Sequence, residues 1–201
     1  MAKQFPSIAD DQKAFIEAQQ IFFVATAAAE GRVNLSPKGM DSLRVMSRNR
    51  VLWRNVTGSV NETAGHLLQN PRMTLMWCSF DTRPLILRLY GTARAIHAAD
   101  PGFAALNALF PPDPGARQVY DMTVDLVQTS CGYAVPLMDY REERPVLRKW
   151  SADKGPEAIR AYWAEKNRET IDGFPTGIPE WRRRPPLPNS ARRAMRSARR
   201  A

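Results

Sequence analysis

The residues of this chain best suited to chemistry gather around one loop-to-helix start. The run Gly58–Thr63 leads into a short helix with apolar residues at helical spacing, and Asn70-Pro71 ends that helix. The first N–H groups of a helix have no helical acceptor, and the helix dipole favours an anion beside them. Together with the basic residues Arg32 and Lys38, this start predicts a site for a phosphate-bearing cofactor.

A second set of polar side chains precedes this helix. In the extended run at 32–36, alternation places Arg32, Asn34 and Ser36 on one face. If the run at 53–55 pairs nearby, an anion meets Lys38, Ser59 and the N–H groups of residues 61–63, because Lys supplies charge and Ser supplies neutral hydrogen bonds. The alternative is the polar outer face of an amphipathic sheet, with Asn61 as an ordinary N-cap.

The elements that must position these residues are mostly strands. Strands are predicted at 22–27, 32–36, 51–56, 73–80, 85–96 and 124–135, and helices after Ser7, at 58–70, at 100–110 and from Gly155-Pro156. Residues 40–50 form a hairpin excursion, and Pro37 marks a sheet edge or a strand end. Short connections favour antiparallel pairing, and closure removes exposed edges. The fold class is therefore mainly β: a six-stranded antiparallel barrel with peripheral α-helices.

Length and charge divide the chain into a body and a tail. With 201 residues and 44% apolar composition, one cored domain over residues 1–180 is expected. Residues 181–201 hold eight arginines and no acid, so the net charge of +9 leaves only +1 for the body. This Arg/Pro-rich tail is predicted to be disordered. As an alternative, it binds nucleic acid or an anionic membrane surface.

Several classes of protein are disfavoured by what the sequence lacks. It has no apolar run of the roughly 20 residues that span a bilayer and no apolar signal segment, so a cytoplasmic protein is expected. Cys78 and Cys131 have no metal-ligand spacing and are expected to be buried, reduced thiols. Hydrolase, nucleotide-binding and zinc-protease motifs are absent, and the two histidines, His66 and His97, are expected to be structural or surface residues.

Several short motifs, in their order along the chain, resemble the pyridoxamine 5′-phosphate oxidase-like family, and most closely its uncharacterised bacterial branch. The resemblance covers residues 5–175 and implies a split β-barrel that forms a homodimer, with FMN in two clefts between the subunits. The motifs are Phe23-Val24-Ala25-Thr26, Gly31-Arg32-Val33-Asn34-Leu35-Ser36-Pro37-Lys38-Gly39, Gly58-Ser59-Val60-Asn61-Glu62-Thr63-Ala64, Asn70-Pro71-Arg72, Arg88-Leu89-Tyr90-Gly91-Thr92-Ala93, Ser130-Cys131-Gly132-Tyr133 and Ile171-Asp172-Gly173-Phe174-Pro175.

The same resemblance implies roles for single residues. Residues 32–36 and 53–56 line the flavin, and residues 59–63 stand where the oxidases place a Ser-Arg-Lys triplet on the FMN phosphate. Here the Arg and Lys of that triplet are missing, and Glu62 is expected to point to solvent. The candidate cofactor-binding residues, among which Lys38, Arg54 and Arg88 are the candidate replacements for the missing charge, are Arg32, Asn34, Leu35, Ser36, Lys38, Trp53, Arg54, Asn55, Ser59, Asn61, Thr63 and Arg88.

Three functions follow from these patterns. The first is an FMN-dependent oxidoreductase with an unassigned small-molecule substrate and electron donor, since a flavin itself carries the electron chemistry. The second is a non-catalytic protein that stores a flavin, a deazaflavin or another phosphorylated ring cofactor. The third is nucleic-acid or membrane binding through the tail. Oxidation of pyridoxamine phosphate itself is not expected, because Trp150 and Arg148 are only loose counterparts of the substrate-binding Trp and Arg.

A homodimer is also predicted from the aromatic content. Tryptophans are enriched in interface cores, and the chain has more of them than one small core easily hides. The alternative is that most are internal. The tryptophans in question are Trp53, Trp77, Trp150 and Trp163.

Overall fold

The computed structural model describes residues 2–180, so the predicted tail at 181–201 lies outside the described residues. The strands are β1 (Lys3–Phe5), β2 (Phe22–Thr26), β3 (Asn34–Lys38), β4 (Leu43–Ser47), β5 (Arg50–Val56), β6 (Arg72–Cys78), β7 (Ile86–His97) and β8 (Ala116–Ser130). The helices are α1 (Asp10–Ala18), α2 (Glu62–Gln69), α3 (Phe103–Asn107) and α4 (Val146–Lys166).

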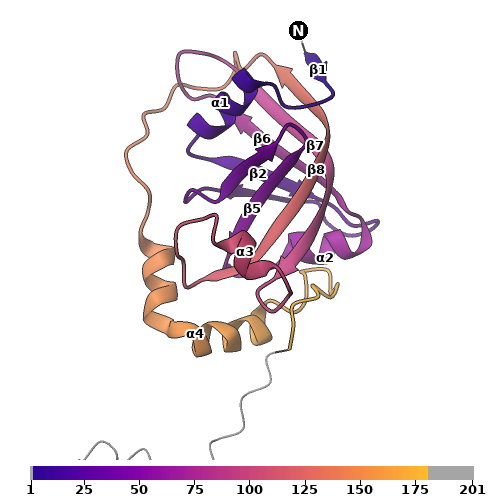
Figure 1. The fold of residues 1–201 in the computed structure, drawn as a ribbon, viewed down its shortest axis with the longest axis vertical. Helices are drawn as coiled ribbons and strands as arrows, with labels where there is room; N and C mark the ends of the chain where they lie inside the picture. Colours follow the sequence, from indigo (N-terminus) through magenta and orange to yellow (C-terminus); the bar gives the residue numbers. More distant parts are fainter. Residues whose placement is uncertain (1, 181–201) are drawn as a thin grey trace, which may run out of the picture.

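All described strands belong to one antiparallel sheet that curls around the core (Figure 1). The order is β3-β2-β6-β7-β8-β5-β4, and β1 pairs with β8. The predicted fold class is confirmed, with eight strands in place of six. The two additional strands are β1, which is only three residues long, and β4, which is one arm of the predicted hairpin excursion and carries a register shift between Val45 and Ser47.

The sheet path has two ends, β3 and β4, and the barrel is split between them. Pro37 lies in the edge strand β3 and pairs with Phe23 of β2. This confirms the edge position expected for a residue that has no N–H to donate. In Figure 1, α2, α3 and α4 gather at one end of the barrel and α1 lies near the other end. The start of α2 therefore lies at the helix-rich end of the barrel (Figure 1).

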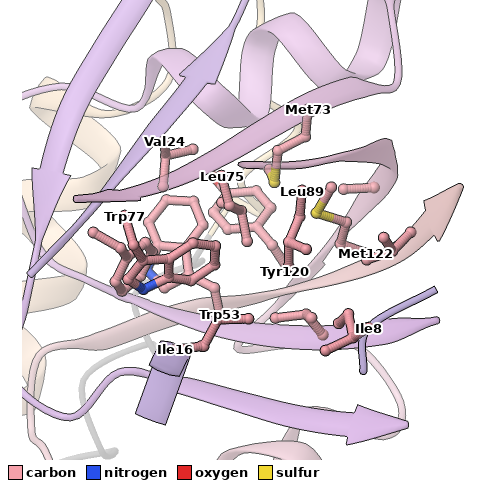
Figure 2. Close-up of a cluster of buried hydrophobic side chains, with 14 of the residues drawn as sticks. Ile8, Ile16, Val24, Trp53, Met73, Leu75, Trp77, Leu89, Tyr120 and Met122 are labelled. Carbon is pink, nitrogen blue, oxygen red and sulfur yellow. The ribbon is translucent and has the colours of Figure 1, made fainter. Parts of the chain in front are cut away.

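The core lies inside the curled sheet and is built around stacked aromatic rings (Figure 2). The Trp53 ring lies on the Tyr120 ring with centroids 4.6 Å apart, and Phe22 stacks on Trp77 at 5.7 Å. Trp53, Trp77 and Trp163 are all buried within the chain. The aromatic content is therefore explained by internal packing, and the dimer prediction loses that argument.

Strand β8 differs from its prediction, which covered residues 124–135. It begins eight residues earlier, at Ala116. The prediction missed this part because the buried polar pair Arg117 and Gln118 interrupts the apolar alternation on which it depended. At Gly91, which pairs with Val124, the β7–β8 register shifts. A Cβ atom at Gly91 would collide with the Thr123 carbonyl, so only glycine fits this close approach.

Three smaller predictions differ from the structure in whole or in part. The N-cap of α1 is Ala9 in place of Ser7, and its N–H donates to Gln12 Oε1 at 2.9 Å. The late helix α4 consists of two helices that meet at a kink at Gly155, where φ is 72°, so a helix does begin at Gly155-Pro156, and the preceding helix from Val146 was not predicted. Cys78 is buried as expected, but Cys131 is exposed, because β8 ends one residue before it.

Two negative findings hold for residues 2–180. No helix in this part of the chain is long and apolar enough to cross a membrane. No three metal-binding side chains gather into a cluster there either.

Candidate functional site

A cavity of about 350 Å³ lies in the split of the barrel, between β3 and β5, and the start of α2 closes one end of it. We call it the inner pocket. Nine of the twelve predicted binding residues line it: Asn34, Ser36, Lys38, Trp53, Arg54, Asn55, Ser59, Asn61 and Thr63.

Strand register explains why the polar face of β3 turns inward. Asn34, Ser36 and Lys38 pair with Thr26, Val24 and Phe22, all three of which are buried in β2. Paired residues of neighbouring strands point to the same face of a sheet. The polar residues of β3 therefore face the barrel interior at the split, and Asn34 Nδ2 donates to Thr63 Oγ1 at 3.3 Å across it.

Three predicted binding residues are not brought to the inner pocket. The Arg32 guanidinium pairs with Asp172, and the Arg32 N–H donates to the same carboxylate at 2.7 Å. Leu35 faces outward with 65% of its surface exposed. Arg88 lies on β7 and donates to Ser130 Oγ at 3.3 Å. Arg88 is therefore not placed to supply the missing phosphate charge.

Arg54 lines the inner pocket, but its guanidinium is directed elsewhere. It donates to the Pro111 carbonyl and lies 5.1 Å from the centre of the Phe110 ring. Neighbouring residues of a strand point to opposite faces, so Arg54 lies on the face away from Trp53 and Asn55. Its charge therefore serves the loop after α3.

One buried cation of the inner pocket, Arg117 on β8, was not predicted from the sequence. Only 2% of its surface is exposed, and its Nη1 atom donates to Asn167 Oδ1 at 2.6 Å and to the Val60 carbonyl at 3.2 Å. Its Nε atom is buried without a hydrogen-bond partner. Within residues 2–180, no carboxylate forms a salt bridge with Arg117, so its charge is satisfied by neutral acceptors only.

A buried amide, Asn167, holds the loop that leads into α2. Its Nδ2 atom donates to the Gly58 carbonyl at 3.1 Å. The backbone carbonyl of Asn167 accepts hydrogen bonds from Asn61 Nδ2 at 3.4 Å and from Thr176 Oγ1 at 2.6 Å. Trp163 Nε1 donates to Thr57 Oγ1 at 2.8 Å on the same loop. The segment that follows α4 thus fixes the start of α2.

The comparisons with known proteins agree with this fold. The family profile described as pyridoxamine 5′-phosphate oxidase matches residues 8–131, which is more than half of the chain. The chain belongs to the pyridoxamine 5′-phosphate oxidase family. A relative in Aspergillus flavus, the pyridoxamine 5′-phosphate oxidase family protein ustO, is 34% identical over 191 residues, covering 85% of this chain and 76% of that one.

Two solved structures support the fold. HupZ from Group A Streptococcus, as a single-residue variant, superposes with a TM-score of 0.51 and 20% identity over 61% of this chain and 99% of its own. A protein from Lactobacillus delbrueckii named after pyridoxamine 5′-phosphate oxidase superposes with a TM-score of 0.51 and 18% identity, over 61% of this chain and 94% of its own. Members of this family typically bind a flavin and are commonly dimeric.

The charge of Lys38 is sensitive to its surroundings. Burial, and then the nearby positive charge of Arg117, lower the pKa of Lys38 to about 8. Its Nζ atom lies 5.2 Å from the centre of the Trp53 ring. Burial also lowers the pKa of Arg117, to about 10. A pocket in which one buried cation lowers the pKa of another favours an anion.

Glu62, the acidic residue at the start of α2, is turned away from these cations. Glu62 Oε1 accepts the Ile171 N–H at 2.9 Å, and Glu62 Oε2 lies 4.0 Å from His66 Nε2. The expectation that Glu62 points to solvent was wrong, because the segment after α4 covers it. His66 is fully buried beside Thr26 Oγ1 at 3.1 Å, which agrees with a structural role.

Proposed function

We propose that this protein binds FMN in the inner pocket and acts as an FMN-dependent oxidoreductase. One observation carries the proposal: a buried arginine without a carboxylate partner lies beside Lys38 and the N-terminus of α2, in a pocket inside the barrel split. A phosphate dianion is the kind of group that satisfies such a site, because charge-assisted hydrogen bonds are about twice as strong as neutral ones.

The residues divide between the two ends of the proposed cofactor. Arg117, Lys38 and Ser59 would hold the phosphate, together with the free N–H groups at the start of α2. Asn34, Ser36 and Asn55 offer amide and hydroxyl groups to the polar atoms of the ring and its side chain. A bound flavin supplies the electron-transfer chemistry, so the chain needs to bind, orient and shield.

Arg117 thereby replaces the Arg-Lys pair that the oxidases carry in the phosphate loop. The charge comes from β8 in place of residues 61–63, and it reaches the same loop through the Val60 carbonyl. This substitution of one strand for another explains how a chain that lacks the usual triplet keeps a cationic phosphate end.

Titration of the purified protein with FMN and with riboflavin tests the proposal. We expect quenching of flavin fluorescence by FMN binding in the micromolar range or below, and binding of riboflavin at least tenfold weaker. The two ligands share the ring and differ by the phosphate. Equal affinities would remove the phosphate end from the site, and no binding of either flavin would reject the flavin assignment. Deazaflavin phosphates, titrated in parallel, test the alternative cofactor.

Anaerobic mixing of the FMN-loaded protein with NADH or NADPH tests turnover. Bleaching of the flavin band within seconds supports an oxidoreductase that uses a nicotinamide donor, whereas a band unchanged over hours supports the storage function. Light scattering on the same sample tests the homodimer that we propose from the family.

The affinity for FMN should fall at alkaline pH because of Lys38. Its pKa of about 8 means that the ammonium is present below that pH and lost above it. Between about pH 7 and pH 9, FMN affinity is expected to drop ~10-fold, since the protonated form is the one that binds the phosphate. Fluorescence titrations at several pH values measure this.

Riboflavin and the Lys38→Met variant are the controls for this pH effect. Neither should show the drop, because one lacks the phosphate and the other lacks the titrating ammonium. A drop of the same size for riboflavin would mean that the ring or the fold titrates, and it would contradict the role of Lys38.

A further inference from the structure

A second and larger cavity, of about 1090 Å³, opens directly beside the inner pocket. We call it the outer cavity. The two share Lys38, Gly39, Thr57 and Ser59 as lining residues, so a molecule in the outer cavity lies next to the proposed cofactor site. Its volume is slightly above the range of about 300–1,000 Å³ that is typical of small-molecule sites.

The outer wall of this cavity is the connection between β8 and α4. Figure 1 shows this segment running outside the sheet from the end of β8 down to the start of α4. The Met138 N–H donates to the Phe80 carbonyl at 3.0 Å and ties the segment to the chain that follows β6. The cavity therefore lies between the barrel and this connection.

The side chains that line the outer cavity are mainly apolar and aromatic. Trp150 and Tyr162, both on α4, meet edge to face with ring centroids 5.3 Å apart. Phe80, Tyr140 and Leu147 line it from the other sides. Flat aromatic walls favour a ligand that carries rings of its own, because ring pairs add to the burial of apolar area.

The charges of the outer cavity disfavour a phosphorylated ligand. Asp81, Asp139 and Glu143 line it against one cation of its own, Arg144, besides Lys38 at the boundary. Ser79 Oγ donates to Asp81 Oδ1 at 2.7 Å, and this hydrogen bond, with that of the Arg83 N–H, lowers the pKa of Asp81. Its carboxylate is thus ionised near neutral pH and repels an anion.

We propose that the outer cavity binds the molecule that reacts with the flavin, and that this molecule is an uncharged, ring-bearing apolar compound in place of a phosphorylated vitamin. The inference rests on the proposed function for its meaning as a substrate site. Trp150, only a loose counterpart of the family's substrate-binding Trp by sequence, lines this cavity, whereas Arg148 turns away and pairs with Asp113 at 3.7 Å.

N-Phenyl-1-naphthylamine, a neutral fluorophore that brightens in apolar surroundings, tests the site. The FMN-loaded protein and the FMN-free protein are each titrated with it. We expect saturable brightening in the FMN-free protein, and in the loaded protein binding of the same affinity with emission quenched by the adjacent flavin. With the flavin present, 1-naphthol should displace the fluorophore at least tenfold better than 1-naphthyl phosphate.

Val146→Asp and Val33→Asp form a matched pair of variants. Val146 lines the outer cavity and is 69% exposed, and Val33 is 73% exposed and lines neither cavity, so neither change should unfold the chain. An acid in the first turn of α4 also suits the helix dipole. Val146→Asp is expected to weaken fluorophore binding at least tenfold and to leave FMN affinity unchanged. Val33→Asp should change neither.

Three results would overturn the inference. One is equal fluorophore binding by the two variants. Another is preferential displacement by the phosphate. The third is a combination of two observations: the unchanged protein is a dimer that does not brighten the fluorophore, and Val146→Asp converts that dimer to monomers. A second copy of the chain would then fill the outer cavity. Failure of FMN binding alone would reject the proposed function but would leave the fluorophore result for the FMN-free protein standing.

Discussion

Replacing Arg117 with methionine is expected to weaken FMN binding about 100-fold, or ~3 kcal/mol, and to leave riboflavin binding nearly unchanged. Arg117 is the buried cation of the inner pocket, and within residues 2–180 no carboxylate neutralises it. Its positive charge therefore favours the phosphate of FMN and contributes nothing to the binding of a flavin that lacks a phosphate. Fluorescence titration with the two flavins measures the difference directly.

The stability of this variant separates binding from folding. Burying a guanidinium is costly, and apolar residues often replace buried charges at little loss. The change also leaves Asn167 Oδ1 and the Val60 carbonyl without their donor, which costs about 1–3 kcal/mol. A small decrease in the free energy of unfolding is expected from the two effects together, and urea denaturation measures it.

Arg88→Met is the matched control for Arg117→Met. Arg88 lies outside the inner pocket, on β7, so the same loss of charge there should not alter the affinity for FMN. If Arg88→Met weakened FMN binding as much as Arg117→Met, net charge rather than the local site would be responsible. If Arg117→Met reduced the affinities for FMN and riboflavin equally, Arg117 would only shape the pocket.

The Asn167→Asp change is expected to lower FMN affinity by about 100-fold as well, although it alters the side-chain volume little. The amide oxygen of Asn167 accepts from Arg117 Nη1 at 2.6 Å and leaves the positive charge in place. A carboxylate at the same position would form a buried ion pair with Arg117. The phosphate would then meet a neutralised arginine.

The effect of a charge at 167 can be separated from the effect on the loop. Asn167→Ala removes the hydrogen bond to the Gly58 carbonyl but adds no charge. Asn167→Asp removes the same donor, so we expect both variants to weaken riboflavin binding by a similar, smaller factor, and only Asn167→Asp to weaken FMN binding by the larger factor. Indistinguishable titrations of the two variants would show that Asn167 positions the loop and does not set the charge of the pocket.

The sequence predicted the parts of the site that depend on local pattern. The alternation of Asn34, Ser36 and Lys38 and the helix start at 61–63 are properties of short segments, and the structure brings them to one pocket. The candidate binding residues Ser36, Lys38 and Thr63 all line this pocket. The prediction for Arg32 was wrong because β3 begins only at Asn34. The Arg32 guanidinium instead forms an ion pair with Asp172, which is distant in sequence.

Arg117 and Asn167 could not be found in the same way. Arg117 is a buried polar residue at the start of a strand, so it breaks the apolar pattern that would have marked β8. Asn167 follows α4 without any motif, and its role depends on contacts with residues more than 100 positions earlier. Such long-range polar contacts have no periodic signature, and only the folded chain reveals them.

The dependence of the α2 loop on Asn167 and Trp163 bears on how far this fold can be treated as a module. The family profile ends at residue 131, and the partners of Thr57 and Gly58 come from beyond that point. A barrel cut at this boundary and grafted into another scaffold would keep its strands and lose the support beneath its anion-facing turn. The start of α2 and the segment around Asn167 therefore have to be kept together in any transplant, despite their separation along the chain.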